Sequence, residues 1–185
     1  RNMIQGHSLK LEGRRKRAEE SQARQMELTM EQNNLLSRIR LLSEMEKEYE
    51  GFQKAVRLIM QAAEKNTLRG VHGPVANLIR TEKQHAVAIE IALGAGLQNI
   101  VVDREEDSKA GIQYLKQRDG GRATFLPMSA IRGGRLQEQG VENEFGFVGV
   151  AADLLQYDEK YRNVMEYLLG RTVVVEDLDC GIAMA

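Results

Sequence analysis

The residues best suited to chemistry are few and poorly grouped. The three histidines, His7, His72 and His85, have neither the HExxH spacing nor the neighbouring cysteine pair of a zinc site. Cys180 is the single cysteine, so it cannot form an intramolecular disulfide, and we expect it to pack as a small apolar side chain near a helix start. Ser129 lacks the GxSxG context of a nucleophile elbow. The sequence therefore predicts no catalytic residue and no metal site.

Two glycine-containing stretches resemble phosphate-binding loops but fail in detail. Gly94-Ala95-Gly96 lacks the third glycine of a dinucleotide loop and follows a predicted helix, where that motif requires a strand. The stretch from Gly70 to Gly73 is not followed by the Lys-Ser/Thr pair of an ATP-binding loop. The carboxylates of residues 103–107 could form an acid/base pair, but their place at a predicted helix start explains them without catalysis. We therefore expect no cofactor.

An internal repeat organises the chain, because residues 70–94 align with residues 146–170 without a gap. Repeats are sought first, since they define the architecture. Apolar positions agree as well as the identities, and a β-branched run follows each copy after a slip of three residues, at 100–102 and 173–175. The identical pairs are Gly70 and Gly146, Gly73 and Gly149, Ala76 and Ala152, Leu78 and Leu154, Glu90 and Glu166, Leu93 and Leu169, and Gly94 and Gly170. The repeat predicts two similar half-domains packed together.

Each copy predicts a unit of helix, helix, strand and helix. The paired glycines are expected to bracket a tight turn, and the second helix is expected to stop at Gly94 or Gly170. The β-branched run predicts a buried strand, after which Asp103 or Asp177 opens the last helix.

The second copy is predicted to be incomplete. In the first copy a short strand at 123–126 follows Gly120-Gly121, and a polar, glycine-broken linker occupies residues 129–145. The equivalent of that strand would lie near 196–199, beyond Ala185. We therefore expect the second sheet to lack its last strand and to expose an edge that can recruit another strand.

Residues 1–66 form a compositionally separate arm, rich in Glu, Lys, Arg, Gln, Leu and Met. From Leu28 an apolar residue returns every seven positions, at Leu35, Leu42, Tyr49 and Val56, and a second seam becomes apolar from Met45 through Phe52 and Ile59. This heptad pattern predicts a coiled-coil helix, with a long amphipathic helix on its own domain as the alternative. No other stretch carries a matching seam, so we expect the partner helix to come from another chain or from further sequence.

The charge balance excludes a strong global attraction to nucleic acid. The net charge is −1, and no apolar run approaches the length of a membrane span. Any DNA contact must therefore use a local patch, without sequence reading and with strong salt dependence. One set of cations lies near the linker: Arg118, Arg122, Arg132 and Arg135. The preferred candidates are Lys54, Arg57, Lys65 and Arg69 at the end of the arm, together with Arg122; solvated surface charge is the alternative for each.

A set of motifs together resembles the hinge region of bacterial SMC (structural maintenance of chromosomes) proteins. They follow a coiled-coil helix and read GVHGPVANLI, AIEIALGAGLQNIVVD, GRATFLPMS, GFVGVAADLL and EYLLGRTVVVED. The resemblance covers nearly the whole chain and implies an α+β fold: a long N-terminal coiled-coil helix, then a hinge of two pseudo-repeated α/β subdomains, the second truncated. The implied boundaries are 1–66 for the arm, 67–140 for subdomain I with its linker, and 141–185 for subdomain II.

The same resemblance implies a function. It implies a homodimer through the hinge, a returning coiled-coil arm of the parent chain, and ATPase activity in distant head domains. It further implies chromosome condensation and segregation in the cytoplasm, at the nucleoid, with non-specific DNA contact near the hinge. The glycines Gly70, Gly73, Gly146, Gly149 and Gly170 are then interface candidates, with intramolecular turns as the alternative explanation. The competing hypothesis for the whole chain is a coiled-coil-linked α/β domain that binds a nucleotide or another small ligand.

Overall fold

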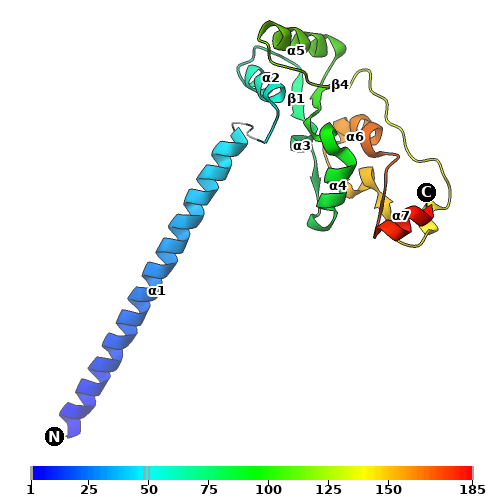
Figure 1. Ribbon diagram of the computed structural model, residues 1–185. Coiled ribbons are helices and arrows are strands. Elements are labelled where there is room, and N and C mark those ends of the chain that lie inside the picture. Colours follow the sequence, from blue (N-terminus) through cyan, green and yellow to red (C-terminus); the bar gives the residue numbers. More distant parts are fainter. Residues whose placement is uncertain (1, 48, 50, 185) are drawn as a thin grey trace. The chain divides into compact units, whose positions relative to one another are not determined.

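The computed structural model describes residues 2–47, 49 and 51–184 (Figure 1). Its contacts divide the chain into two units, residues 1–51 and 52–185. The first unit is the single long helix α1 (Asn2–Lys47). Leu28, Leu35 and Leu42 of the predicted heptad seam are all exposed on α1. An exposed apolar seam of this kind is stabilised only when a second helix packs against it.

The predicted arm helix ends earlier than its heptads suggested. After α1, Tyr49 has a left-handed φ of 54°, and a new helix, α2 (Lys54–Glu64), begins five residues later. Val56 and Ile59, which the heptad pattern placed on the seam, are instead buried in the second unit. Helical spacing alone cannot distinguish a seam that faces another chain from a face that packs on its own domain. The heptad assignment beyond Lys47 was therefore wrong, because residues 54–64 form a separate helix of the second unit.

The second unit alternates short strands and helices. In the first half (residues 70–127) the elements are β1 (Val71–Pro74), α3 (Val75–Leu78), β2 (Arg80–Thr81), η1 (Lys83–His85), α4 (Ala86–Leu93), η2 (Gly94–Gln98), β3 (Ile100–Val102), α5 (Glu105–Gln117) and β4 (Phe125–Pro127). After the 3-10 turn η3 (Val141–Asn143), the second half (residues 146–184) contains β5 (Phe147–Val150), η4 (Ala151–Leu154), β6 (Leu155–Gln156), η5 (Glu159–Tyr161), α6 (Arg162–Leu169), β7 (Val173–Val175) and α7 (Leu178–Met184).

The repeat is visible in the strand pairing of both halves. β1 pairs antiparallel with β3, and β5 pairs antiparallel with β7. Each pair contains one register shift, before Gly73 in the first half and before Gly149 in the second. A bulge at this position adds one residue to the outer strand and increases its twist. The sequence repeat is therefore a structural repeat, down to the position of the irregularity.

The first sheet has three strands and the second has two. In the first half β3 lies between β1 and the parallel strand β4, and all three β3 residues are fully buried. In the second half, among the residues that the structure describes, β7 pairs with β5 alone. As far as the described residues extend, the second sheet is therefore two-stranded.

The two halves join through a third pair of strands. β2 pairs antiparallel with β6, and Arg80 lies opposite Gln156, its equivalent in the repeat. A pair formed by equivalent residues lies on an approximate two-fold axis between the halves. The hydroxyl of Thr81 adds a hydrogen bond across this junction to the Leu154 carbonyl, at 2.9 Å.

The halves share one hydrophobic core around this axis. Its buried members come largely from equivalent positions of the repeat: Val75 and Ala151, Ile89 and Met165, Leu93 and Leu169, and Val101 and Val174. Burying such side chains against each other supplies most of the free energy that folds a domain. Neither half therefore buries its apolar face without the other.

Three local expectations are corrected by the structure. The Gly70–Gly73 segment is strand β1 instead of a tight turn, and the helix expected after it is the single turn α3. Four-residue strands and one-turn helices carry too few residues for their periodicity to be decisive. Asp177 does cap α7, accepting a 2.8 Å hydrogen bond from the Cys180 amide. Asp103 does not cap α5; the Asp107 carboxylate performs that role by accepting from the Arg104 amide at 3.0 Å.

Candidate functional site

The predicted interface glycines have specific backbone environments within the chain. Gly70 and Gly146 are equivalent, and both have positive φ, 68° and 78°. A side chain at Gly70 would collide with the Asp107 carboxylate, and one at Gly146 would collide with Cys180. Asp107 and Cys180 are themselves equivalent, so both halves bring the start of the last helix against the first glycine of the repeat. Glycine is required there for both φ and space.

The remaining three glycines differ in how tightly they are enclosed. Gly73 has a φ of 138° at the bulge of β1, and its equivalent Gly149 lies against the Leu154 side chain. Gly170 ends α6, and a side chain there would collide with the Gly134 and Glu166 carbonyl oxygens. These intramolecular requirements account for each glycine. A role in a contact between chains remains a prediction.

The DNA-contact candidates are divided into two groups, one at each end of α2. Lys54 and Arg57 are one turn apart near its start, and the Lys54 ammonium donates to the Asp119 carbonyl at 3.1 Å. Exposed Arg122 lines a surface cleft with Gln53 of that same end. We call Lys54, Arg57 and Arg122 the α2-start cluster.

Lys65 and Arg69 lie at the other end of α2, roughly 16 Å away along the helix axis. Arg69 lines a second cleft, shared with Arg104 and with the carboxylates of Asp103 and Asp107. Nearby carboxylates repel a phosphate and offset the two arginines. The cleft beside Arg69 therefore carries opposite charges at close range.

The linker cations hold the linker in place. Arg135 forms ion pairs with Asp153 at 2.5 Å and Glu166 at 3.4 Å, and its hydrogen bond to Asp153 raises its pKa above the ordinary arginine value. The Leu136 amide donates to the Gly170 carbonyl at 2.8 Å. Arg132 donates to the Ser129 and Ile131 carbonyls. The segment predicted as a polar linker thus packs along α6, and its arginines are engaged within the chain.

A polar bridge crosses between the halves at His72. Its ring nitrogens lie 3.0 Å from the Tyr161 hydroxyl and 2.8 Å from an Asp103 carboxylate oxygen. Tyr161 is buried and meets the His72 ring edge-on. The arrangement gives the hydroxyl of buried Tyr161 a hydrogen-bond partner and links β1 to η5. Among the described residues, His72 and Asp103 are not part of any group of three possible metal ligands.

Cys180 occupies the position that Asp107 has in the first half, so a thiol replaces a carboxylate there. Its side chain is buried against Gly146, and its hydrogen bond with Asp177, followed by burial, raises the pKa of the thiol above its ordinary value. A raised pKa suppresses the thiolate, which is the reactive form. The expectation of an inert packing cysteine agrees with this environment.

Sequence reasoning missed the His72 bridge and the division of the cations. The alignment placed His72 opposite Val148 and Tyr161 opposite His85, so the repeat gave no reason to pair His72 with Tyr161. Arg122 joins the α2-start cluster because it lies beside Gln53, a neighbour distant in the sequence that no pattern indicated. None of the described helices has the length and apolarity needed to cross a membrane.

Comparison with known proteins identifies this architecture. Residues 68–185 match the family of SMC proteins Flexible Hinge Domain. Chromosome partition protein Smc of Desulfitobacterium hafniense is 38% identical over 92% of this chain, and that of Bacillus subtilis is 43% identical over 75%. The chain spans only 14% and 12% of those two relatives.

Solved structures show the same fold. The hinge domain of Geobacillus stearothermophilus SMC, crystallised as an asymmetric dimer, has a TM-score of 0.75 and 37% identity, and covers 80% of this chain and 60% of its own. The Pyrococcus furiosus Smc hinge domain with an extended coiled coil has a TM-score of 0.60 and 31% identity, over 78% of this chain and 51% of its own. The chain belongs to the SMC flexible hinge domain family.

Proposed function

We propose that this chain is the dimerisation hinge of an SMC protein that organises, condenses and segregates chromosomal DNA. The observation that carries the proposal is the family match over residues 68–185, which spans both halves of the second unit. The dimer reported for the Geobacillus hinge supports self-association, and the names of the chromosome partition relatives support the chromosomal role. A hinge domain has a mechanical role, which agrees with the expectation that this segment is not an enzyme.

Two surfaces support assembly: one supports self-association through the second unit, and the other supports packing of a second helix on the arm. The first is the side of β7 that no described strand covers. In the first half the Ile100 amide donates to Thr124 and the Val102 carbonyl accepts from Met128, both toward β4. The equivalent groups of Val173 and Val175 point to the side where the second half has no described strand. An exposed edge of this kind binds another strand. The second surface is the apolar seam of α1, which suits the returning arm.

Sedimentation equilibrium tests the dimer directly. We would compare this chain with one extended through the next strand and the returning arm. Dimerisation of either form supports the hinge function, and dimerisation of the longer form alone assigns the contact to the added segment. A monomer in both forms, at concentrations well above micromolar, would contradict it. A ligand-dependent thermal shift in such a monomer would instead favour the small-ligand alternative.

Non-specific DNA contact is the finer part of the proposal, and the α2-start cluster is its candidate surface. Phosphate contacts make log K fall with log salt by about 0.9 per phosphate neutralised. We expect replacing Lys54, Arg57 and Arg122 with alanine to lower that slope by about 2 to 3 for any duplex sequence. The double variant Lys65→Ala/Arg69→Ala is the matched control and should lower the slope of log K against log salt by less. Equal losses from both variants would contradict the assignment to the α2-start cluster, and absence of binding at low salt would remove DNA contact from the proposal.

A further inference from the structure

Because of the internal repeat, each surface position of the first half has an equivalent position in the second half. At three exposed positions the first half carries a charge and the second half carries a large apolar side chain. Phe145, Leu178 and Ile182 are 86%, 78% and 66% exposed. Their equivalents in the first half, Arg69, Glu105 and Lys109, are all exposed and charged. Single exposed apolar side chains are ordinary on protein surfaces, whereas a group of them is typical of an interaction site.

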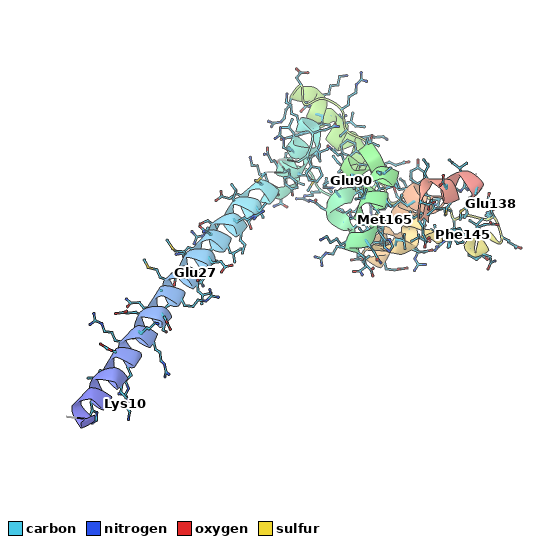
Figure 2. The ribbon with its side chains drawn as sticks, turned by 60° about the horizontal axis from the view of Figure 1, so that its bottom comes forward. Lys10, Glu27, Glu90, Glu138, Phe145 and Met165 are labelled. Carbon is cyan, nitrogen blue, oxygen red and sulfur yellow. The ribbon has the colours of Figure 1, made fainter. Side chains whose placement is uncertain are left out.

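The three apolar residues lie around one end of α7. Leu178 is its first residue, and Ile182 follows one turn later on the same face. Phe145 precedes Gly146, whose carbonyl accepts a 2.9 Å hydrogen bond from the Glu176 amide, two residues before Leu178. Figure 2 shows Phe145 beside α7. We call Phe145, Leu178 and Ile182 the α7 face.

A strand equivalent to β4 would not cover the α7 face. In the first half β4 meets α5 at Gly111, where the Phe125 ring leaves no room for a side chain, and Leu115 is buried on the same helix. Glu105 and Lys109, the equivalents of Leu178 and Ile182, stay exposed although β4 is present. The α7 face therefore points away from the position of that strand.

The charges around the α7 face are acidic. Five exposed carboxylates lie within four residues of it along the chain: Glu142, Glu144, Glu176, Asp177 and Asp179. The segments 136–159 and 172–185 contain no lysine or arginine. Of the second half's three cations, Lys160 and Arg162 are paired with Asp158 and Glu159, and Arg171 lies along the linker at Gly134. Such a surface repels nucleic acid and attracts cations.

We propose that the α7 face binds a basic amphipathic helix of a partner protein. Two large side chains one turn apart, with a third at the helix end, fit the i and i+3/i+4 anchors with which an amphipathic helix docks. The acidic rim fits lysines or arginines flanking those anchors and supplies orientation and association rate. This inference goes beyond the hinge function and does not rest on it, because peptide binding is measurable whether or not the chain dimerises or binds DNA.

The first experiment uses a defined probe. A fluorescent 18-residue helical peptide, with leucines at i, i+3, i+4 and i+7 and lysines elsewhere, is titrated with the 185-residue chain by anisotropy. The control peptide keeps the leucines and replaces every lysine with glutamate. We expect the lysine peptide to bind at least tenfold more tightly, and its affinity to fall between 50 and 300 mM salt. Equal affinity for the two peptides would overturn the proposal.

The second experiment locates the binding. The charge-neutral variant Leu178→Gln/Ile182→Gln is expected to weaken lysine-peptide binding at least tenfold. The matched control is Val87→Gln/Ile91→Gln on α4, which removes an equally exposed apolar pair one turn apart, and should change affinity less than twofold. Circular dichroism melting checks that both variants fold.

Two results would overturn this location. If the α7 and α4 variants bind the lysine peptide equally well, the binding is not at the α7 face. The second result concerns self-association. If the α7 variant no longer self-associates, and if the lysine peptide neither binds the parent chain nor reduces its self-association, the α7 face is a contact between two copies of this chain. Weakening by Asp179→Asn, in contrast, would support the acidic rim as part of the site.

Discussion

The first half (residues 70–127) and the second half (residues 146–184) build the same bulged strand pair, yet they enclose it differently. Gly94 ends α4 with open space around it, whereas its equivalent Gly170 lies under the Gly134 carbonyl of the linker. The first half continues into a third strand, β4, whereas the linker that precedes the second half packs against the end of α6. Equivalent residues thus experience different constraints, and substitutions at equivalent positions measure that difference.

The largest contrast is expected at the helix ends. Gly170→Ala places a methyl group against two carbonyl oxygens, which are backbone atoms and cannot move aside cheaply. We expect a loss of about 3 kcal/mol in the free energy of unfolding. Gly94→Ala meets no neighbour and costs only backbone strain, about 2 kcal/mol, because φ 47° with ψ −124° is a conformation that side-chain-bearing residues rarely adopt. Urea denaturation of both variants measures the difference, and equal losses would show that the linker yields freely at Gly170.

The next contrast is at the first glycine of each half. Both Gly70→Ala and Gly146→Ala adopt a strained positive φ, about 1 kcal/mol each. At Gly70 the obstructing atoms belong to the Asp107 carboxylate, a short side chain that can rotate away at the cost of its hydrogen bond with the Arg104 amide, whereas at Gly146 they belong to buried Cys180. We expect Gly146→Ala to cost about 2 kcal/mol in total. Denaturant unfolding tests this, with Gly146→Ala/Cys180→Ala as a check: the two substitutions should be less than additive because alanine at position 180 removes the sulfur, the nearer of the two Cys180 atoms in the collision.

A smaller effect is expected at the polar bridge between the halves. Tyr161→Phe removes the hydroxyl that pairs with His72 at 3.0 Å and leaves a buried ring unchanged in shape. We expect a loss of about 1 kcal/mol, the usual net value of such a hydrogen bond. Tyr114→Phe, whose ring lies under the Arg118 guanidinium in the first half, is the control and should stay within about 0.5 kcal/mol. A neutral Tyr161→Phe would mean that core packing alone joins the halves there.

The repeat made much of this fold predictable from sequence, because two aligned copies support each assignment twice. The helix ends at Gly94 and Gly170, the β-branched strands and the missing last strand were all predicted in this way. The short strands β2 and β6 were not, since two residues have no periodicity and their pairing depends on bringing the halves together. The break after Lys47 was missed because apolar residues continue at heptad spacing through α2.

The candidate site was less predictable than the fold. Sequence identified the glycines as special, but the atoms that exclude their side chains, such as the Gly134 carbonyl and Asp107, lie far away in sequence. The cations were identified by type alone, and Arg132 and Arg135 could not be distinguished from Arg122 until their carbonyl and carboxylate partners were known. Surface function depends on which charges remain unpaired after folding, and pairing is a long-range property.

The smallest expected effect is the change in stability that acid causes through Asp177, the cap of α7. The Cys180 amide donates to the Asp177 carboxylate and lowers its pKa below the ordinary value of about 3.9. The ionised cap therefore stabilises the folded chain above that value, and the contribution is lost as pH falls through the lowered pKa. Asp177→Asn keeps an N-cap but cannot titrate. We expect it to melt below the parent chain at pH 7, and we expect the difference to shrink as pH falls below the ordinary aspartate pKa, as followed by circular dichroism between pH 7 and pH 2. Parallel melting curves across that range would show that the charge on Asp177 does not stabilise α7, leaving the cap geometry alone to hold the helix against Gly146.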